Sequence, residues 1–414
     1  MSNQKLLSKI LRLKELKITG FEFKDRGKEL HLGVKPYKNG CCCQQCQRRC
    51  PIVRHGTVSR SWSDVTILGL KVVLWYFPKE IHCPAHGKAQ EELPWAAPLS
   101  RVTYRLEFLI CGMSQIMTQK AAAGILAMPA STLSDLLHRV ITRVRAGHRI
   151  RGLVTLGVDE ISYLKGRKFC TIVYDLDRSC VLWVGQGKGR ATIDRFFNEQ
   201  LSAGQRKRIQ WASCDMSLAY TEAIKHHCPG AKLVIDRFHI VKALNEAVDE
   251  VRKQEWRDLD VDGRKAIKGL RWLLGMSAKN RTKKNTRFLN ALSKSNRRIH
   301  RAWVLKDEFD HFWSFISKTS AEKYLQQWMT SALRSRIPSL KTFVGTLRFH
   351  YDNIIAFIDR PLTNAVGEGI NRILKLVKNR ASGFRNLESF ADLIFLTMGD
   401  LDILAQIPSG LRTL

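Results

Sequence analysis

Residues 153–159 decide the fold: Leu153-Val154-Thr155-Leu156-Gly157-Val158-Asp159 is a short apolar run that stops on a carboxylate. Such a run predicts a buried β-strand with Asp159 at its carboxyl end. Two further runs, residues 168–176 and 180–187, are rich in β-forming residues and bounded by turn residues. They predict the next two strands of the same sheet.

Helices then alternate with strands. The expected order is helix, strand, helix and strand, at residues 191–201, 209–214, 222–227 and 233–235. The two strands end on Asp215 and Asp236. Three strands, helix, strand, helix and strand, with carboxylates ending the first, fourth and fifth strands, is the order of an RNase H-like core. We therefore expect an α/β fold with a mixed five-stranded sheet and helices.

A helix near the C-terminus offers a third catalytic carboxylate. Residues 364–380 predict an amphipathic helix whose apolar positions are Ile370, Ile373, Leu374 and Val377. Its polar stripe, at steps of four, three and four, consists of Asn364, Glu368, Asn371 and Lys375. Glu368 and Lys375 lie about two turns apart and point the same way. A carboxylate between an amide and an ammonium group suits a place where metal and phosphate meet.

Three acidic side chains that meet at one place would suit metal-dependent cleavage and joining of phosphodiester bonds. Phosphodiester hydrolysis and strand transfer need two oxygens stabilised in line, which two cations about 4 Å apart achieve. Hard cations prefer carboxylate oxygens, and Asp159, Asp215 and Glu368 would supply them from two strand ends and one helix. Glu160 is the alternative for the first position, but alternation along the strand points it away from Asp159.

Length and charge fit a large protein that binds a polyanion. The chain has 414 residues, which indicates two to four domains. Lys+Arg 69 against Asp+Glu 37 gives a formal charge of +32, which favours nucleic acid first and an anionic membrane surface second. No apolar stretch is long enough to span a bilayer, and no apolar signal region follows Met1. We therefore expect a cytoplasmic protein.

Six of the 11 cysteines lie near the N-terminus, at Cys41, Cys42, Cys43, Cys46, Cys50 and Cys83. In a reducing compartment this cluster predicts metal binding rather than disulfides. Two ligand pairs, Cys43 with Cys46 and Cys83 with His86, suit tetrahedral structural zinc. The metal would stabilise a β module too small to fold unaided. Cys42, Cys50 and His82 are rival ligands.

Residues 119–144 have the pattern of a helix-turn-helix. A short helix at 119–126 and a break at 128–131 precede a second helix, for which Thr132 is the expected N-cap. Its apolar face holds Leu133, Leu136, Leu137, Val140, Ile141 and Val144. Its other face holds Ser134, His138, Arg139, Thr142 and Arg143. We expect contacts to DNA from Ser134, His138, Arg139 and Arg143.

Four stretches of the chain resemble the insertion-sequence transposases of the ISL-three family. They are residues 157–160, 214–217, 236–239 and 368–375, and residues 378–386 extend the last of them. The resemblance covers nearly the whole chain, although such zinc modules usually end in cysteine where His86 stands here. It implies that Asp159, Asp215 and Glu368 are the catalytic triad of a DDE enzyme. Asp236 and His239 match a D-x-x-H element that supports the site.

Further roles and the domain organisation follow. We expect Asn371 and Lys375 to support the site, and Lys378 and Arg380 to bind DNA. The expected domains are a zinc module (1–95), a helix-turn-helix domain (96–150), the first part of the RNase H-like core (151–240), an all-helical insertion (241–350) and the C-terminal part of the core (351–414).

The expected function is that of a DNA transposase. It would bind the terminal inverted repeats of an insertion sequence and catalyse strand cleavage and transfer with magnesium or manganese, using zinc for structure only. The alternatives are a non-catalytic zinc and helix-turn-helix regulator, or a structure-specific nuclease on the same fold. We expect double-stranded DNA as the partner, association with the nucleoid, no membrane, and a homodimer or higher oligomer on DNA.

Overall fold

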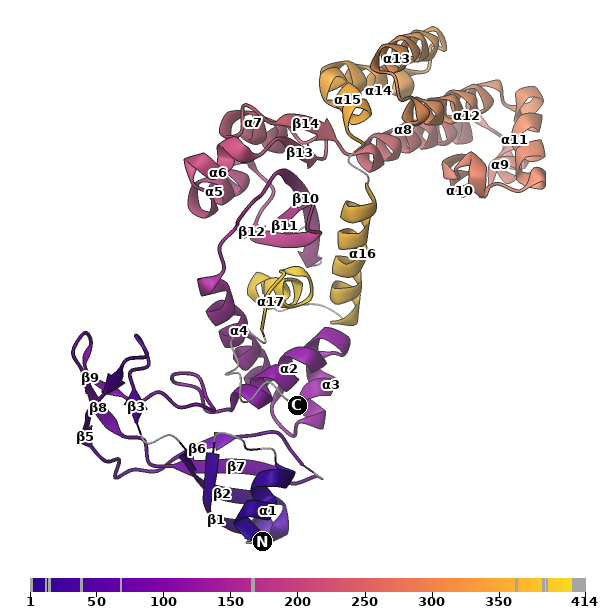
Figure 1. Cartoon of the computed structure of the whole chain (residues 1–414). Coiled ribbons are helices and arrows are strands. Elements are labelled where there is room, and N and C mark those ends of the chain that lie inside the picture. Colours follow the sequence, from indigo (N-terminus) through magenta and orange to yellow (C-terminus); the bar gives the residue numbers. More distant parts are fainter. Residues whose placement is uncertain are drawn as a thin grey trace. The chain divides into compact units, whose positions relative to one another are not determined.

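The computed structural model describes residues 3–403, except 12, 14–15, 38–39, 68, 165–167, 362–363, 382–383 and 385; the side chains of residues 266 and 364–368 also lie outside the description. The chain divides into two compact units, each described by itself (Figure 1). Unit 1 comprises Met1–Arg149 and Leu376–Leu414, and unit 2 comprises Ile150–Lys375. The segment 351–414, expected to be one part of the core, is thus divided between the units.

Unit 2 is built on a mixed five-stranded sheet in the order β12-β11-β10-β13-β14. The strands are β10 (Thr155–Leu164), β11 (Lys168–Asp175), β12 (Cys180–Gln186), β13 (Trp211–Cys214) and β14 (Lys232–Ile235). The first three pair antiparallel, whereas β10, β13 and β14 pair parallel. The expected α/β fold with a five-stranded mixed sheet is confirmed at this level.

The first strand is longer than its sequence predicted. β10 does not end on Asp159 but continues to Leu164. The reason is that its two neighbours end at different places: pairing with β13 reaches only Gly157, whereas the antiparallel pairing with β11 extends to Leu164. Asp159 therefore lies inside the strand, where β10 has a partner on one side only.

Three helices accompany this sheet: α5 (Arg190–Gln200), α6 (Ala203–Arg208) and α7 (Leu218–His227). The apolar positions of α5 and α7 follow the helical period, and Phe196, Phe197 and Tyr220 are fully buried. They join Leu156 and Val158 of β10 in one hydrophobic core.

After β14 the described chain of unit 2 is helical. The helices up to the end of the bundle are α8 (Arg237–Asp258), α9 (Val261–Ile267), α10 (Leu270–Gly275), η2 (Ala278–Asn280), α11 (Lys283–Ser295), α12 (Arg297–Phe309), η3 (Asp310–Ser314), α13 (Lys318–Arg334), α14 (Pro338–Phe349) and α15 (Tyr351–Asp359). Figure 1 shows them gathered beyond β14, with α8 as the long helix that leaves the sheet. α16 (Asn364–Arg380) follows.

Unit 1 begins with α1 (Asn3–Ile10) and small antiparallel and mixed sheets. The strands are β1 (Leu16–Lys24), β2 (Glu29–Pro36), β3 (Cys41–Cys42), β4 (Arg49–Cys50), β5 (Ile52–Arg54), β6 (Arg60–Ser63), β7 (Lys71–Tyr76), β8 (Glu80–Cys83) and β9 (Gly87–Gln90), with η1 (Asp25–Gly27) between the first two. They form the sheets β1-β2-β7-β6, β5-β8-β9 and β3-β4. Alternate residues of β1, β2 and β7 form one buried face of the four-stranded sheet together with Trp62 of β6, and Trp95 joins the same core.

Four helices complete unit 1: α2 (Tyr104–Ile116), α3 (Gln119–Ile125), α4 (Ala130–Gly147) and α17 (Leu387–Met398). The six predicted apolar positions of α4 are all buried. Its predicted start is wrong, since α4 begins at Ala130 after Pro129, and Thr132 lies inside the helix rather than at its N-cap. Proline fixes its own φ and suits the position before a helix, so the break and the cap coincide.

None of the helices in the described residues is both long and apolar enough to cross a bilayer.

Candidate active site and metal centre

The carboxylates of three adjacent strands stand in one row. The parallel registers pair Gly157 with Ser213, and Ser213 with Val234. Two positions further along lie Asp159, Asp215 and Asp236. Since side chains two residues apart point to the same face, we expect the three acids on one side of the sheet. Their proximity is supported by Nε2 of His239, which is 3.8 Å from Asp159 and from Asp236, and by the charge of Asp159, which raises the pKa of Asp215.

The opposite face is apolar, which fixes this orientation. Val158 and Cys214, each adjacent to one of the acids, are buried in the core of unit 2. A register slip by one residue would bury the acids and expose that core. Gly157 is also required, because a Cβ there would lie 2.0 Å from the ring of Tyr174 on the paired strand β11. The Tyr174 ring therefore crosses β10 directly beside Asp159.

Asp159 is buried and held by polar contacts. Its Oδ2 accepts a hydrogen bond of 2.6 Å from Nδ2 of Asn371, on α16. Its Oδ1 accepts one of 2.7 Å from the backbone N–H of Glu160 and lies 3.8 Å from Nε2 of His239. One oxygen of Asp159 is thus fixed by α16, and the other faces the imidazole.

His239 lies between two of the acids. Its Nε2 is 3.8 Å from Oδ1 of Asp159 and also 3.8 Å from Oδ2 of Asp236. Asp236 is the N-cap of α8, since its Oδ1 accepts a hydrogen bond of 2.9 Å from the N–H of Phe238. This cap fixes the first turn of α8, and His239 in that turn therefore lies close to both Asp159 and Asp236.

Asp215 follows β13 directly and is half-buried. Burial raises the pKa of its carboxyl group, and the charge of Asp159 raises it further. The backbone N–H of Ser217, which donates to Oδ1 at 2.9 Å, and the charge of His239 act in the opposite direction. Two neighbouring carboxylates in a partly dehydrated place are a site that a cation would stabilise.

The helix α16 carries the other residues that were predicted for the site, Glu368, Asn371 and Lys375. Asn371 contacts Asp159, whereas Lys375 is exposed. Of the predicted apolar face, Ile370, Leu374 and Val377 are buried and Ile373 is half-buried. Glu368 belongs to α16, but its side chain lies outside the described residues. It is three residues before Asn371, a spacing that places two residues on one face of a helix.

Two neighbours of the acids were missed by the sequence analysis. Tyr174 could have been found, because a glycine inside a buried strand, here Gly157, often marks the close approach of another group. Lys188 lies between β12 and α5, and its Nζ is 3.8 Å from Oε2 of Glu160 and 4.4 Å from the ring centre of Phe169. Its charge also lowers the pKa of Asp215.

The cysteine cluster forms a compact group in unit 1. The ligand atoms of Cys43, Cys46, Cys83 and His86 all lie within 4.8 Å of one another. Nδ1 of His86 is 3.6 Å from Sγ of Cys43 and 3.5 Å from Sγ of Cys83, and Cys46 Sγ is 3.6 Å from Cys83 Sγ. A tetrahedral zinc with bonds of about 2.3 Å to sulfur and 2.0 Å to nitrogen has ligand separations of this size.

The backbone around the cluster favours thiolates. Burial by itself would raise the pKa of Cys83, but hydrogen bonds from the backbone of Ala85 and His86 and from the thiol of Cys46 lower it to about 7. Backbone hydrogen bonds from Cys46 and Gln45 lower the pKa of Cys43. Thiolates are the form in which cysteine binds metal.

The rival ligands lie outside the group of four. Cys50 donates its thiol hydrogen to the carbonyl oxygen of Arg48 at 3.2 Å, although its side chain also interacts with Cys83. His82 is not among the four residues whose ligand atoms lie within 4.8 Å of one another. Cys42 is half-buried on β3. Cys41 also belongs elsewhere, because its thiol donates to the buried carboxylate of Glu91 at 3.0 Å.

The polar face of α4 is partly used inside unit 1. His138 Nδ1 is 2.9 Å from Oδ2 of Asp392 on α17, and Arg143 binds Glu107 of α2 at 2.5 Å. Arg139 is exposed, and its Nε donates a hydrogen bond of 3.4 Å to the carbonyl oxygen of Asp135 in the same helix. Ser134, also on this face, is half-buried.

The two basic residues near the end of α16 that were expected to bind DNA differ in their exposure. Arg380 is exposed, and its guanidinium donates to the carbonyl oxygen of Gln115 at the end of α2. Lys378 is half-buried.

Comparison with known proteins gives consistent results over most of the chain. A family model for DDE transposases of the ISL-three type, described as "Transposase", matches residues 156–394. The transposase for insertion sequence element IS1001 of Bordetella parapertussis is 33% identical over 373 residues, which cover 88% of this chain and 91% of that protein. The transposase for insertion sequence element IS1557 of Mycobacterium tuberculosis is 25% identical over 380 residues, which cover 86% of this chain and 85% of that protein.

Among solved structures, the Drosophila P element transposase strand transfer complex contains a similar chain. The similarity covers 72% of this chain and 92% of that chain, with 9% sequence identity and a TM-score of 0.37.

Proposed function

This chain belongs to the ISL-three family of DDE transposases, and from this premise we propose that Asp159, Asp215 and Glu368 are its catalytic carboxylates. The chain is therefore a DNA transposase, an enzyme of strand cleavage and strand transfer. We propose that residues 151–240 and 351–414 form an RNase H-like core around the helical segment 241–350. The strand order, with three antiparallel and then two parallel strands, supports this arrangement.

The observation that carries the site assignment is the row of acids on adjacent strands. The charge of Asp159 raises the pKa of Asp215, which supports their proximity, and Asn371 ties α16 to Asp159. Glu368 on that helix would complete the set from one turn away. The donor set, two strand carboxylates and a helical one, fits magnesium or manganese, which prefer oxygen ligands.

When bound, such cations would stabilise the attacking and leaving oxygens of the phosphodiester and lower the pKa of the attacking water. The residues of the chain have separate roles. Asn371 holds one oxygen of Asp159 so that the other faces His239. Asp236 and His239 support the row through the cap of α8. Lys375, exposed on the same helix, would contact a DNA phosphate.

The test uses duplexes with the ends of the element, taken from the DNA that flanks the gene. Asp215→Asn keeps the size of the side chain but removes a charge, so cleavage and joining should fall steeply while binding to the ends persists. Asp262→Asn is the matched control, because Asp262 is exposed on α9. Full activity of Asp215→Asn would overturn the site assignment. Cleavage without joining by the wild-type chain would favour a structure-specific nuclease.

We propose that unit 1 supplies recognition and a structural zinc site. Cys43, Cys46, Cys83 and His86 would bind zinc within residues 1–95, because their separations fit tetrahedral coordination. Residues 96–150 would place α4 in the major groove, with Ser134 and Arg139 toward the bases. Because His138 and Arg143 already bind Asp392 and Glu107, we give them the secondary role of fixing α4.

Further binding follows from charge. Lys378 and Arg380 would bind phosphate, as expected of a chain with a formal charge of +32. We propose that the chain acts as a homodimer or higher oligomer on double-stranded DNA at the nucleoid, because two element ends must be joined in one reaction.

A further inference from the structure

The turn Gly187-Lys188-Gly189, between β12 and α5, is held in one conformation by its surroundings. The backbone N–H of Gly187 donates to the carbonyl oxygen of Phe169 at 3.0 Å, and the carbonyl oxygen of Gly187 accepts a hydrogen bond of 2.9 Å from Oγ1 of Thr171. Gly187 has a φ of +98°, which favours glycine, and a Cβ there would lie 2.8 Å from Oγ1 of Thr192. The side chain of Lys188 therefore extends from a rigid base.

The ammonium group of Lys188 lies close to the proposed catalytic acids. Its Nζ is 3.8 Å from Oε2 of Glu160 and 4.4 Å from the ring centre of Phe169. Glu160 directly follows Asp159, and its backbone N–H donates to Oδ1 of Asp159 at 2.7 Å. The charge of Lys188 also lowers the pKa of Asp215. A cation is thus present beside the acids, and its ion-pair partner is Glu160 rather than a proposed metal ligand.

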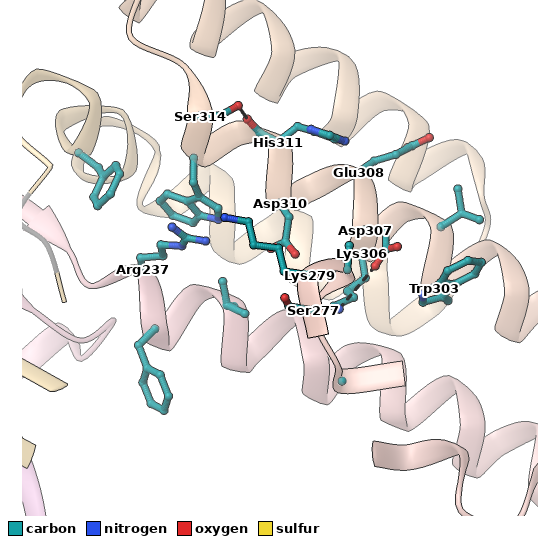
Figure 2. A pocket seen from close by; sticks show the side chains of 17 residues that line it. Arg237, Ser277, Lys279, Trp303, Lys306, Asp307, Glu308, Asp310, His311 and Ser314 are labelled. Carbon is teal, nitrogen blue, oxygen red and sulfur yellow. Dashed lines mark hydrogen bonds and ion pairs between the residues drawn. The ribbon is translucent and has the colours of Figure 1, made fainter. Parts of the chain in front are cut away.

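The ion pair of Lys188 and Glu160 is a weak one. The side chain of Lys188 is 54% exposed, and the distance of 3.8 Å exceeds the length of about 2.7–3.2 Å of an N–H···O hydrogen bond. Exposed pairs of this kind contribute little to stability. Lys306 shows the contrasting case of a lysine that serves the fold (Figure 2). It lines a cavity of about 900 Å³ in the helical part of unit 2, is buried, and donates from Nζ to the carbonyl oxygen of Met276 at 2.9 Å. Lys188, unlike Lys306, can exchange its partner at little cost.

Charge determines what kind of partner would replace Glu160. The acids Asp159, Glu160 and Asp215 carry the same sign of charge as DNA, so they repel the strand that they must act on. An ammonium group is a compact charge that binds phosphate, and a cation placed at a phosphate stabilises its negative charge. A lysine at this place would therefore offset the repulsion for one phosphate of the strand.

We propose that Lys188 binds a backbone phosphate of the DNA strand that is cleaved, next to the cleaved bond, and that Glu160 holds the ammonium group in place until the strand binds. This inference rests on the proposed function, because it places the strand at Asp159 and Asp215. On binding, the ammonium group exchanges an oxygen of Glu160 for an oxygen of the phosphate. Lys188 is thus a positioning residue of the reaction, which holds the strand while the acids hold the metal.

The first test measures the coupling between Lys188 and one phosphate. The full-length chain binds duplexes with the element's end, and calcium replaces magnesium to keep the strand intact. A neutral methylphosphonate replaces each phosphate beside the cleavage site in turn, for the wild type and for Lys188→Ala. At one position we expect it to weaken binding of the wild type about tenfold, the lower end for a hydrogen bond to a charged group, and to leave binding of Lys188→Ala nearly unchanged. Equal losses in both proteins at every position would overturn the proposal.

The second test is the salt dependence of binding to the unmodified duplex. Lys188→Ala should reduce the slope of log K against log salt concentration by about one, because one phosphate contact is lost. Lys188→Arg should keep the slope, since it keeps the charge.

Lys232→Ala is the matched control. Lys232 is 60% exposed, its Nζ lies 3.4 Å from Oδ2 of Asp359, and the ring centre of Trp211 is 5.2 Å away. It therefore has the same kinds of neighbour as Lys188. It begins β14, however, four residues before Asp236, which is about 13 Å along an extended strand. We expect neither coupling nor a change of slope. An equal fall of the slope in both alanine variants would indicate a general effect of charge and overturn the proposal.

Thermal unfolding distinguishes a role in binding from a role in the fold. The melting temperature of Lys188→Ala should stay close to that of the wild type, because an exposed ion pair contributes little. A lower melting temperature in both Lys188→Ala and Glu160→Gln, without coupling to any phosphate, would assign the pair to the fold and overturn the proposal. Failure of the proposed function is distinguishable. Full cleavage by Asp215→Asn would refute the catalytic site itself, whereas an inactive Asp215→Asn together with an uncoupled Lys188 would overturn this inference alone.

Discussion

Asn371 donates a hydrogen bond of 2.6 Å from its side-chain Nδ2 to Oδ2 of Asp159, across 212 positions of the sequence. The bond joins the helix α16 to the middle of β10. It also leaves Oδ1 as the oxygen of Asp159 that faces His239. An amide that orients a carboxylate in this way stabilises one geometry of the site without changing its charge.

Asn371→Ala should therefore lower cleavage by about 10- to 100-fold, because hydrogen bonds that orient metal-binding groups have effects of this size. Binding to the element's ends should not change, since recognition is assigned to unit 1. The measurement is cleavage and gel-shift affinity on the same duplex. Asn290→Ala, an exposed position on α11, serves as the control. Unchanged cleavage in Asn371→Ala would show that Asp159 needs no such support.

The raised pKa of Asp215 predicts a pH-dependent stability. Burial raises this pKa above its ordinary value of 3.8, so the folded state binds the proton more tightly than the unfolded state. The favourable contribution of Asp215 is then complete below pH 3.8 and is lost as the pH rises through the folded-state pKa. Without divalent cations, Asp215→Asn should raise the melting temperature at pH 7, and the difference should shrink as the pH falls toward 3.8.

Magnesium provides the internal check on this prediction. The cation should raise the melting temperature of the wild-type chain at pH 7, because it compensates the buried charge, and should have a smaller effect on Asp215→Asn. Asp262→Asn should behave as the wild type, since Asp262 is exposed. Equal melting temperatures of the wild type and Asp215→Asn at every pH would contradict the expected linkage.

Much of the sheet could be predicted because its strands are short apolar runs with clear ends. β13 and β14 stop directly before Asp215 and Asp236, as the sequence indicated. The length of β10 could not be predicted in this way, since it depends on which neighbour each part of the strand pairs with. The start of α4 was missed for a local reason, because Thr132 resembles a cap but Pro129 already ends the turn.

Contacts between distant segments were beyond the sequence. α17 packs within unit 1. There Asp392 contacts His138 of α4, and the ring of Phe395 lies 3.6 Å from the guanidinium of Arg145. The periodicity of a helix predicts that it has an apolar face but not which partner covers that face. Asn371 was expected to support the site, but the periodicity of its helix could not show that its partner is Oδ2 of Asp159.

The two arginines on the polar face of α4 should respond differently to removal. Arg139 is exposed, so Arg139→Ala should weaken DNA binding and reduce the dependence of log K on log salt concentration by about one. Arg143 pairs with the buried Glu107, so Arg143→Ala should destabilise the fold by about 3 kcal/mol. Salt titrations and thermal unfolding measure the two effects. If Arg143→Ala instead reduced the salt dependence of DNA binding and left the thermal unfolding unchanged, Arg143 would be a DNA contact.

Zinc content should distinguish the four proposed ligands from their rivals. We expect about one zinc per chain in the purified wild-type protein, because the group has four ligand atoms within 4.8 Å. Cys46→Ser should lose the metal and lower the melting temperature, since a thiolate at this site contributes to folding through the metal.

Cys42→Ser and Cys50→Ser are matched controls that change the same atom in the same short stretch. Both should keep the zinc, because Cys50 donates to the Arg48 carbonyl and Cys42 lies outside the group. His86→Cys should also keep it, since a thiolate can replace an imidazole in tetrahedral coordination. Mass spectrometry under native conditions gives the stoichiometry for each variant. Loss of zinc from Cys50→Ser but not from Cys46→Ser would move the site to the rival thiol, and a metal-free wild-type chain that is stably folded would remove zinc from the account of unit 1.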